Sequence, residues 1–298
     1  MPDVAHISVM QEEVITLLRG ARAGWIVDGT VGQGGHSRAI LAATPIELRV
    51  LGFDRDPQAI AASRVRLAEF GDRFVAVHAG YETIAAVVAS MGISPVVGIL
   101  LDLGLSSTQL GSDRGFSFSG DSSQPLDMRF DPGDGVTAAD VIMALPIKTL
   151  AERFRELADV PMAGRLARIL KEEAGKGRMQ TVGEFVDVCH RIYGPRIRRL
   201  PSPTLPAQAL RMMVNSELER LSSFFDAVDG VMAPGGTLVA ISFHSGEDRI
   251  VKHSMRRMAK EGWSLPFVKP MLPSPAECET NSRSKCARLR AAVRCQAI

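Results

Sequence analysis

Acidic and glycine residues with the spacing of a ligand-binding turn occur early in the chain. The stretch Asp28-Gly29-Thr30-Val31-Gly32-Gln33-Gly34-Gly35-His36-Ser37 follows the apolar run Trp25-Ile26-Val27. An apolar run, clustered glycines and a second apolar segment predict a strand, a tight turn and the start of a helix. Because Gly32, Gly34 and Gly35 lack Cβ atoms, the backbone can approach a bound molecule, and N–H groups of the new helix point toward it. The turn indicates a site for an anionic or hydrogen-bond-accepting ligand, with a purely structural turn as the alternative.

Polar residues also end three later apolar runs. They are Asp54 after 50–53, Asp102 after 96–101 and His244 after 237–243. The carboxyl ends of parallel strands meet at one edge of an open α/β sheet, and ligands bind there. Asp54 lies about 20 residues beyond the glycines, where a carboxylate accepts hydrogen bonds from ribose hydroxyls. Capping of the helix that begins near Pro57 is the alternative, and it suits Asp56 better than Asp54.

Glycines followed by a ribose carboxylate fit a nucleoside-containing cofactor, either a dinucleotide or S-adenosylmethionine. Asp28 precedes the glycines and is placed to hold a cationic amine, and Ser37 stands where a dinucleotide fingerprint has its third glycine. Both features favour S-adenosylmethionine, and a nicotinamide-dependent oxidoreductase is the competing interpretation. Tyr81, after a third strand at 74–77, is placed to cover the base of the ligand, or simply to pack.

The rest of the pattern predicts an open α/β sheet interrupted by helices. A short helix is expected at 6–18, with His6 as a candidate site residue, and residues 111–132 predict a long loop. Residues 137–193 have helical periodicity, and the prolines between 195 and 206 end that region. A long amphipathic helix is then expected from 207 to about 228, ended by Ala233-Pro234-Gly235-Gly236. We predict a doubly wound α/β domain formed by 1–110 and 207–298, with a loop and an inserted helical domain at 111–206.

The composition is that of an ordinary globular protein. The 298 residues are 46% hydrophobic and 23% charged. No run approaches the ~20 apolar residues of a membrane span, and residues 1–11 do not resemble a signal peptide, so we predict a cytoplasmic protein without a membrane partner. The four cysteines form no C-x-x-C pair, which argues against zinc, and we predict no metal ligands.

The net charge of +2 is unevenly distributed. Residues 148–211 contain 13 Lys and Arg against 7 Asp and Glu, and residues 249–298 contain 11 against 3. Two basic segments beside an acidic remainder suit a polyanionic partner that touches particular regions of the surface. A solvated charged surface is the alternative.

Several longer motifs occur in a fixed order along the chain. The motifs are the glycine turn at 28–37, Phe53-Asp-Arg-Asp-Pro-Gln-Ala-Ile60, Leu100-Leu-Asp-Leu-Gly-Leu-Ser-Ser107 with Gln109, Arg114-Gly-Phe-Ser-Phe118, Pro125-Leu-Asp-Met-Arg129, Gln208-Ala-Leu-Arg211, Val214-Asn-Ser-Glu-Leu218, and Ile241-Ser-Phe-His-Ser245 with Glu247-Asp-Arg-Ile-Val-Lys252. In these motifs and their order the chain resembles the RsmH (MraW) family of bacterial ribosomal RNA cytosine-N4 methyltransferases, and the resemblance spans residues 6 to 294.

The resemblance implies a Rossmann-like S-adenosylmethionine-dependent methyltransferase fold. It also implies methyl transfer to the exocyclic amine of a cytidine in the decoding region of small-subunit (16S) ribosomal RNA, free or in the assembled 30S subunit. By that resemblance the cofactor is lined by Gly34, Gly35, His36, Asp54, Tyr81, Asp102 and Gln109, to which the turn adds Asp28 and Gly32. We predict Asp102 as the catalytic residue and, as substrate contacts, Ser106, Ser107, Arg129, Arg211, Asn215 and His244.

The sequence departs from the family pattern mainly inside the insert. Leu157-Ala-Asp-Val-Pro161 replaces a Tyr-Gly-Glu-Glu-Arg-like run, and Pro201-Ser-Pro-Thr-Leu-Pro-Ala207 replaces a His-Pro-Ala-Thr-Arg-Thr-Phe-like run. Two alternatives therefore stay open. One is a non-catalytic RNA-binding module that keeps the fold, and the other is methylation of a different amine, on another RNA or on a protein. The sequence does not reveal the oligomeric state.

Overall fold

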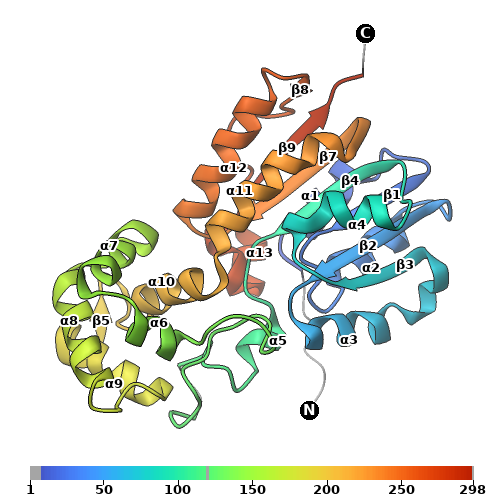
Figure 1. Cartoon of the computed structure of the whole chain (residues 1–298). Helices are drawn as coiled ribbons and strands as arrows, with labels where there is room; N and C mark the ends of the chain where they lie inside the picture. Colours follow the sequence, from blue (N-terminus) through green and yellow to red (C-terminus); the bar gives the residue numbers. More distant parts are fainter. Residues whose placement is uncertain (1–7, 119–120, 297–298) are drawn as a thin grey trace. The chain divides into compact units, whose positions relative to one another are not determined.

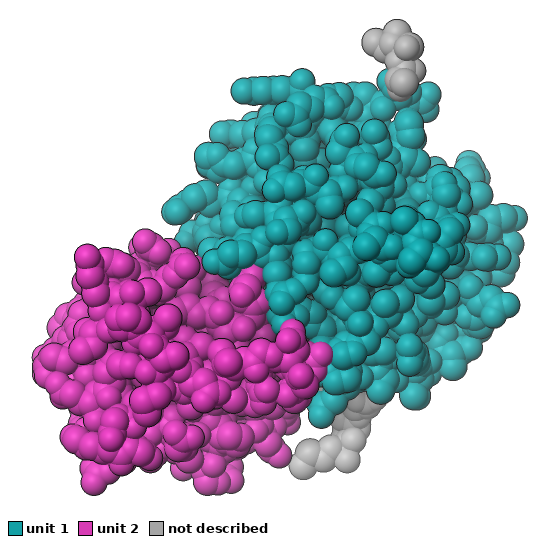
Figure 2. Space-filling view, viewed as in Figure 1, with its two compact units in different colours: residues 1–107, 218–298 teal, residues 108–217 magenta. Residues whose placement is uncertain are grey.

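The computed structural model describes residues 8–118 and 121–296, and the chain forms two compact units. Unit 1 consists of residues 1–107 and 218–298, and unit 2 of residues 108–217 (Figure 2). The sequence predicts boundaries at 110/111 and 206/207, and the second of these falls inside a helix, residues 204–215, that belongs to unit 2. The candidate residue His6 lies outside the described residues.

Unit 1 is built on a mostly parallel sheet with the strand order β3-β2-β1-β4-β7-β9-β8 (Figure 1). The first five strands of that order are mutually parallel, and β9 pairs antiparallel with both β7 and β8. The strands are β1 (Gly24–Asp28), β2 (Leu48–Asp54), β3 (Phe74–His78), β4 (Val96–Asp102), β7 (Met232–Ser242), β8 (Trp263–Ser264) and β9 (Arg288–Arg294). The predicted α/β doubly wound class is confirmed.

Alternate residues of the strands enter two separate cores because successive side chains point to opposite faces of a sheet. Val27, Leu51 and Leu101 belong to one core, which also receives side chains of α4, α11 and α12. Ile26 and Leu100 belong to the other, which receives side chains of α1 and α2. Burial on both faces explains the continuous apolar runs of the parallel strands.

The helices of unit 1 follow the strands along the chain. They are α1 (Gln11–Leu18), α2 (Gly35–Ala43), α3 (Pro57–Arg66), α4 (Ile84–Ser90), α11 (Glu217–Ala227), α12 (Ser245–Met258) and α13 (Pro275–Thr280), with short 3₁₀ segments at Ala68–Arg73, Tyr81–Thr83, Val228–Gly230 and Ser282–Cys286. The first residue of α11, Glu217, is assigned to unit 2. Among the described residues, no helix combines the length and the apolar character needed to cross a membrane.

Unit 2 is a helical module with its own core. Its helices are α5 (Ser107–Leu110, which begins at the last residue of unit 1), α6 (Ala138–Ala144), α7 (Ile147–Ala158), α8 (Ala163–Ala174), α9 (Val182–Tyr193) and α10 (Thr204–Asn215), with a short hairpin of β5 (Arg196–Ile197) and β6 (Leu200–Pro201). Phe154, Leu166, Phe185 and Leu210 are fully buried between these helices. Residues 137–193 are helical as predicted, and the described part of 111–132 forms a loop.

The single helix expected from 207 to about 228 is wrong. The chain instead forms α10 and α11, separated at Ser216, whose backbone is left-handed with φ 50°. Tertiary hydrogen bonds of the preceding Asn215 hold this break, and periodicity cannot reveal them. α10 begins earlier than predicted because Pro206, in its first turn, forfeits no intrahelical hydrogen bond.

The stop signal at residues 233–236 is also wrong, since these residues lie inside β7. Val96 pairs with Met232 and Gly98 with Thr237, so the extra residues of β7 form a bulge opposite β4. Gly235 supplies the positive φ of 81° that this bulge needs.

Candidate functional site

The sheet of unit 1 reverses its strand order between β1 and β4, and the polar residues at the two strand ends meet there. From β1 the chain proceeds to β2 and β3 on one side, while β4 and β7 lie on the other. A crevice outside the carboxyl ends of the strands at such a switch point is the usual ligand site of open α/β sheets. Thr30 joins the two ends because its Oγ1 accepts a hydrogen bond from the Asp102 backbone N–H at 2.7 Å.

Asp28, at the end of β1, holds the glycine turn together from inside. Its side chain is 1% exposed; Oδ2 accepts a hydrogen bond from the Ser37 hydroxyl at 2.6 Å, and Oδ1 accepts one from Thr30 N at 3.2 Å. Burial raises the pKa of Asp28, and the Ser37 hydrogen bond opposes that rise. Both carboxylate oxygens are therefore used within the turn.

Asp54, at the end of β2, bonds to the same turn. Its Oδ2 accepts a hydrogen bond from Gly32 N at 2.9 Å and its Oδ1 accepts one from Asp56 N at 2.9 Å. Burial raises the pKa of Asp54 to about 6, against the lowering effect of these two hydrogen bonds. The alternative capping role belongs to Asp56, which accepts from Gln58 N at the start of α3. Each oxygen of Asp54 keeps a lone pair for a ligand hydroxyl.

The glycine turn follows the predicted strand, turn and helix arrangement. Gly32 and Gly34 have φ of +50° and +79°, and a Cβ on Gly34 would lie 2.8 Å from Leu67 Cδ1. Gly35 opens α2, and a Cβ there would lie 2.3 Å from the Ser8 hydroxyl. The first turn of α2 has no side-chain cap, so its N–H groups are available to an acceptor on a ligand.

Asp102 and His36 face each other where β4 ends and α2 begins. His36 Nε2 lies 3.5 Å from Asp102 Oδ2, and His36 is 6% exposed. Within the described part of the chain, neither ring nitrogen of His36 nor Asp102 Oδ1 has a hydrogen-bond partner. Buried polar atoms without partners are rare in proteins, and a polar ligand is one way to satisfy them.

Two aromatic rings pack close to these strand ends. Tyr81 lies beside the end of β1, because a Cβ on Gly29 would be 3.1 Å from Tyr81 Cβ, and its ring contacts Phe224 edge to face at 5.9 Å. Phe243 lies over the backbone of Gly104, where a Cβ would be 2.9 Å from the ring. Phe243 is not among the residues predicted from the sequence. The motif Ile241-Ser-Phe-His-Ser245 contains it, so its position between β7 and His244 could have indicated it.

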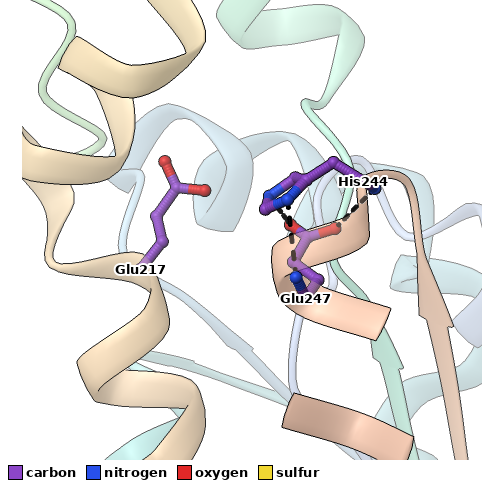
Figure 3. Close-up of side chains that lie close together, drawn as sticks. All are labelled: Glu217, His244 and Glu247. Atoms are coloured by element: carbon purple, nitrogen blue, oxygen red, sulfur yellow. Dashed lines mark hydrogen bonds and ion pairs between the residues drawn. The ribbon is translucent and has the colours of Figure 1, made fainter. Parts of the chain in front are cut away.

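His244 immediately precedes α12 and is its N-cap residue (Figure 3). Its Nδ1 accepts a hydrogen bond from Glu247 N at 3.4 Å, and Glu247 Oε2 accepts from Phe243 N at 2.9 Å and from His244 N at 3.3 Å. His244 Nε2 lies 3.1 Å from Glu247 Oε1. This reciprocal cap fixes the orientation of the imidazole at the end of β7. Glu217, also drawn in Figure 3, accepts two hydrogen bonds from Arg211, at 2.8 and 2.9 Å.

The substrate residues predicted in unit 2 form hydrogen bonds within that unit. Arg129 forms a two-point pair with Asp127, at 2.8 Å for both bonds. Asn215 is 2% exposed; its Nδ2 donates to Met128 O and Arg211 O, and its Oδ1 accepts from Phe130 N. These bonds fix the loop before α6 and the end of α10.

The remaining predicted residues lie next to α5. Ser106 lies beside the glycine turn, since a Cβ on Gly32 would be 3.7 Å from Ser106 Cβ. Gln109 is buried in α5, and its carbonyl accepts hydrogen bonds from the backbone and hydroxyl of Ser112. The side chain of Ser107 lies outside the described part of the structure.

The strand ends of unit 1 fit a cofactor with a nucleoside and charged groups. The glycine turn lets a ligand come close to the backbone, and Asp54 offers lone pairs to hydroxyl groups of the ligand. His36 and Asp102 face each other with buried polar atoms. A rigid frame holds these groups, because Thr30, Asp28 and Ser37 bond to one another or to the neighbouring strand end.

Comparison with known proteins agrees with this geometry. A family model described as the MraW methylase family matches residues 3–295. A ribosomal RNA small subunit methyltransferase H of Oleidesulfovibrio alaskensis is 39% identical over 313 aligned residues, covering 97% of this chain and 95% of that protein. Proteins with the same name from Sorangium cellulosum and Synechococcus elongatus are each 40% identical over 291 residues, covering 97% of this chain and 90% and 94% of theirs. The chain therefore belongs to the MraW methylase family, whose methyl donor is S-adenosylmethionine.

Proposed function

We propose that this methyltransferase acts on the exocyclic N4 amine of a cytidine in the decoding region of small-subunit ribosomal RNA. The observation that supports it most is Asp102, at the β1/β4 switch point, with Oδ1 lacking a hydrogen-bond partner among the described residues. Relatives that cover almost the whole chain are named as methyltransferases of the small ribosomal subunit RNA. A decoding-region cytidine is the substrate that the sequence motifs imply.

Unit 1 provides the cofactor contacts in this proposal. The glycine turn and the first N–H groups of α2 hold the charged end of the ligand, and Asp54 accepts hydrogen bonds from its ribose hydroxyls. Tyr81, beside Gly29, packs against the base. Gln109 belongs to unit 2 and stays a cofactor residue predicted from the family resemblance alone. Asp28 acts indirectly, because it is 1% exposed and its two oxygens accept hydrogen bonds from Ser37 and Thr30 inside the turn that it holds together. When bound, S-adenosylmethionine supplies an electrophilic methyl group.

Asp102 compensates for the weak nucleophilicity of a cytosine amine. The amine lone pair is delocalised into the ring, and positive charge grows on nitrogen as the new C–N bond forms. A carboxylate oxygen that accepts a hydrogen bond from the amine N–H stabilises that charge most in the transition state. The same oxygen is placed to take the proton that the methylated nitrogen releases. His36, 3.5 Å from Oδ2, and the Thr30 bond to the Asp102 backbone keep the carboxylate in place.

The target base must leave its stack to reach such an edge. Ser106, Ser107 and His244 lie at or next to strand ends of unit 1 and are proposed to contact the base or its sugar. Arg129, Arg211 and Asn215 also have structural contacts inside unit 2: Arg129 pairs with Asp127, Arg211 pairs with Glu217, and Asn215 joins the loop to α10. The proposed substrate is ribosomal RNA, free or within the 30S subunit. Because this substrate is in the cytoplasm, we propose that the protein is cytoplasmic.

The test is transfer of a tritiated methyl group from S-adenosylmethionine to small ribosomal subunits and to free small-subunit RNA. Both substrates come from a strain that lacks the modification. Nuclease digestion and mass spectrometry of the nucleosides then identify the product. We expect label in N4-methylcytidine, and the better substrate decides between free RNA and the assembled subunit.

Label in another nucleoside would replace the proposed amine with a different one. Absence of transfer, with S-adenosylhomocysteine binding intact by calorimetry, would instead favour a binding module that retains the fold.

A further inference from the structure

Unit 2 exposes a group of arginines that comes from two segments far apart in the sequence. We call it the arginine cluster, and it consists of Arg155, Arg165, Arg196, Arg198 and Arg199. The first segment is the end of α7, the turn at 159–162 and the start of α8, and the second is the β5–β6 hairpin. All five side chains are exposed. No step proposed for methyl transfer uses them.

Specific hydrogen bonds hold the two segments together. Arg198 Nη2 donates to Asp159 O at 3.1 Å, and the Tyr193 hydroxyl donates to Pro161 O at 2.7 Å. Arg155 lies beside the first turn of α8, because a Cβ on Gly164 would be 3.6 Å from its Nη2. These bonds hold together the two backbone segments that carry the cluster, and the two departures from the family pattern, at 157–161 and 201–207, flank it.

The hairpin has an unusual backbone for its sequence. Arg198 adopts φ 52°, a left-handed conformation that costs roughly 1–2 kcal/mol for a residue with a Cβ and favours Gly or Asn. Ile197, 4% exposed, anchors the hairpin, and Ser202 N donates to Pro195 O at 3.2 Å across its base. The strand register leaves Arg198 and Arg199 as a two-residue loop, and the turns that close such loops need a positive φ at the first of the two residues. Here the strained residue presents a charge to solvent.

The charge environment of the cluster differs from that of other arginines in unit 2. Arg153, Arg168 and Arg178 pair with Glu156, Glu172 and Glu173 at 3.7, 2.7 and 3.9 Å. The five cluster arginines form no such ion pair with any described residue. Asp159 is the one carboxylate in 159–165, and 195–203 contains none. Guanidinium groups without a carboxylate partner suit phosphate, which they bind in two-point geometry.

We propose that the arginine cluster binds backbone phosphates of the substrate RNA and contributes affinity without contributing to chemistry. This inference rests on the proposed RNA substrate. Arginine contacts with phosphate position RNA without reading its sequence, and their strength falls steeply with salt. The two drifted segments change the surroundings of the cluster and leave its charges in place.

The test compares two variants with the same change in charge. The cluster variant is Arg196→Gln/Arg198→Gln/Arg199→Gln, and the control is Arg153→Gln/Arg168→Gln/Arg178→Gln, which removes three paired arginines of the same unit. We expect the cluster variant to raise KM for RNA at least tenfold with kcat within about twofold. The slope of log Kd against log salt should fall by about 2–3, at roughly 0.7–0.9 per lost phosphate contact. The control should stay within twofold in KM.

Equal KM values and equal salt slopes in the two variants would overturn the proposal. A cluster variant that fails to fold is replaced by Arg155→Gln/Arg165→Gln, which changes no left-handed residue, with an expected rise in KM of at least threefold. Unchanged KM in that double variant would also overturn it. RNA binding is measured separately by filter retention. The wild-type protein could bind RNA in a salt-dependent way, with binding lost in the cluster variant, and yet transfer no methyl group. That result would contradict the proposed function and support RNA binding by the arginine cluster.

Discussion

The strand ends of unit 1 and the arginine cluster of unit 2 use charge in opposite ways. Asp28 is buried and Asp54 and Asp102 are partly buried, and backbone or hydroxyl donors fix the carboxylates of Asp28 and Asp54. The backbone N–H of Asp102 donates to Thr30 Oγ1. The cluster arginines are exposed, and their charges are not neutralised by described carboxylates. Buried, oriented charge stabilises a small change in charge at one atom, whereas exposed charge attracts a polyanion over a wide area. In the proposed functions, unit 1 carries out methyl transfer and the arginine cluster of unit 2 binds the RNA backbone.

Among the substitutions in unit 1, Gly34→Ala should have the largest effect on cofactor binding. The new Cβ would lie 2.8 Å from Leu67 at a φ of +79°, next to the first turn of α2. Gly92→Ala is the matched control, since Gly92 has φ +62° and open space around it. Both variants should lose about 1 kcal/mol of unfolding free energy through backbone strain. Only Gly34→Ala should weaken S-adenosylhomocysteine binding, by at least 30-fold in calorimetry. Equal affinities in the Gly34→Ala and Gly92→Ala variants would contradict the proposal that the glycine turn contacts the cofactor.

Acidification should weaken cofactor binding through Asp54. The pKa of this carboxyl is raised to about 6, so it gains a proton as the pH falls below 6, and the protonated form is a poorer acceptor for ribose hydroxyls. We expect Kd for S-adenosylhomocysteine to rise about tenfold per pH unit below 6. Stability responds with the opposite sign, because a raised pKa means that the folded protein without cofactor binds this proton more tightly than the unfolded chain.

Asp54→Asn isolates both effects. The variant should bind the cofactor more weakly at pH 7.5, and the part of the pH dependence due to residue 54 should disappear. A wild-type affinity that does not change between pH 7.5 and pH 5 would remove Asp54 from the ribose contact. The measurement is calorimetry in a series of buffers, together with denaturant unfolding at the same pH values.

Asn215→Ala should have a smaller effect, confined to unit 2. It removes three hydrogen bonds at 2.8–2.9 Å and leaves buried partners unsatisfied, at a cost of about 2–3 kcal/mol. Amide hydrogen exchange near Phe130 should accelerate, while affinity for S-adenosylhomocysteine should stay within about twofold. A large loss of cofactor affinity would show that unit 2, besides its proposed contacts with RNA, also affects cofactor binding.

The sequence predicts the strand ends well and the insert less well, for physical reasons. Parallel strands covered on both faces are continuous apolar runs, so the positions of Asp28, Asp54 and Asp102 could be predicted from local pattern. The break at Ser216 depends on bonds from Asn215 to Met128 and Phe130, about 85 residues away, and no local pattern encodes it. The bulge of β7 likewise depends on its pairing with β4. The arginine cluster depends on a contact between Arg198 and Asp159, 39 positions apart.

The central claim is that Asp102 acts on the amine in the transition state, and single-turnover methyl transfer by Asp102→Asn tests it most directly. The substitution keeps the size of the side chain and removes the charge. With cofactor and RNA both saturating, we expect the rate to fall by about 10²–10³, the usual cost of removing one oriented group that stabilises transition-state charge. A single-turnover rate within threefold of wild type, in a variant that still binds S-adenosylhomocysteine, would contradict the account.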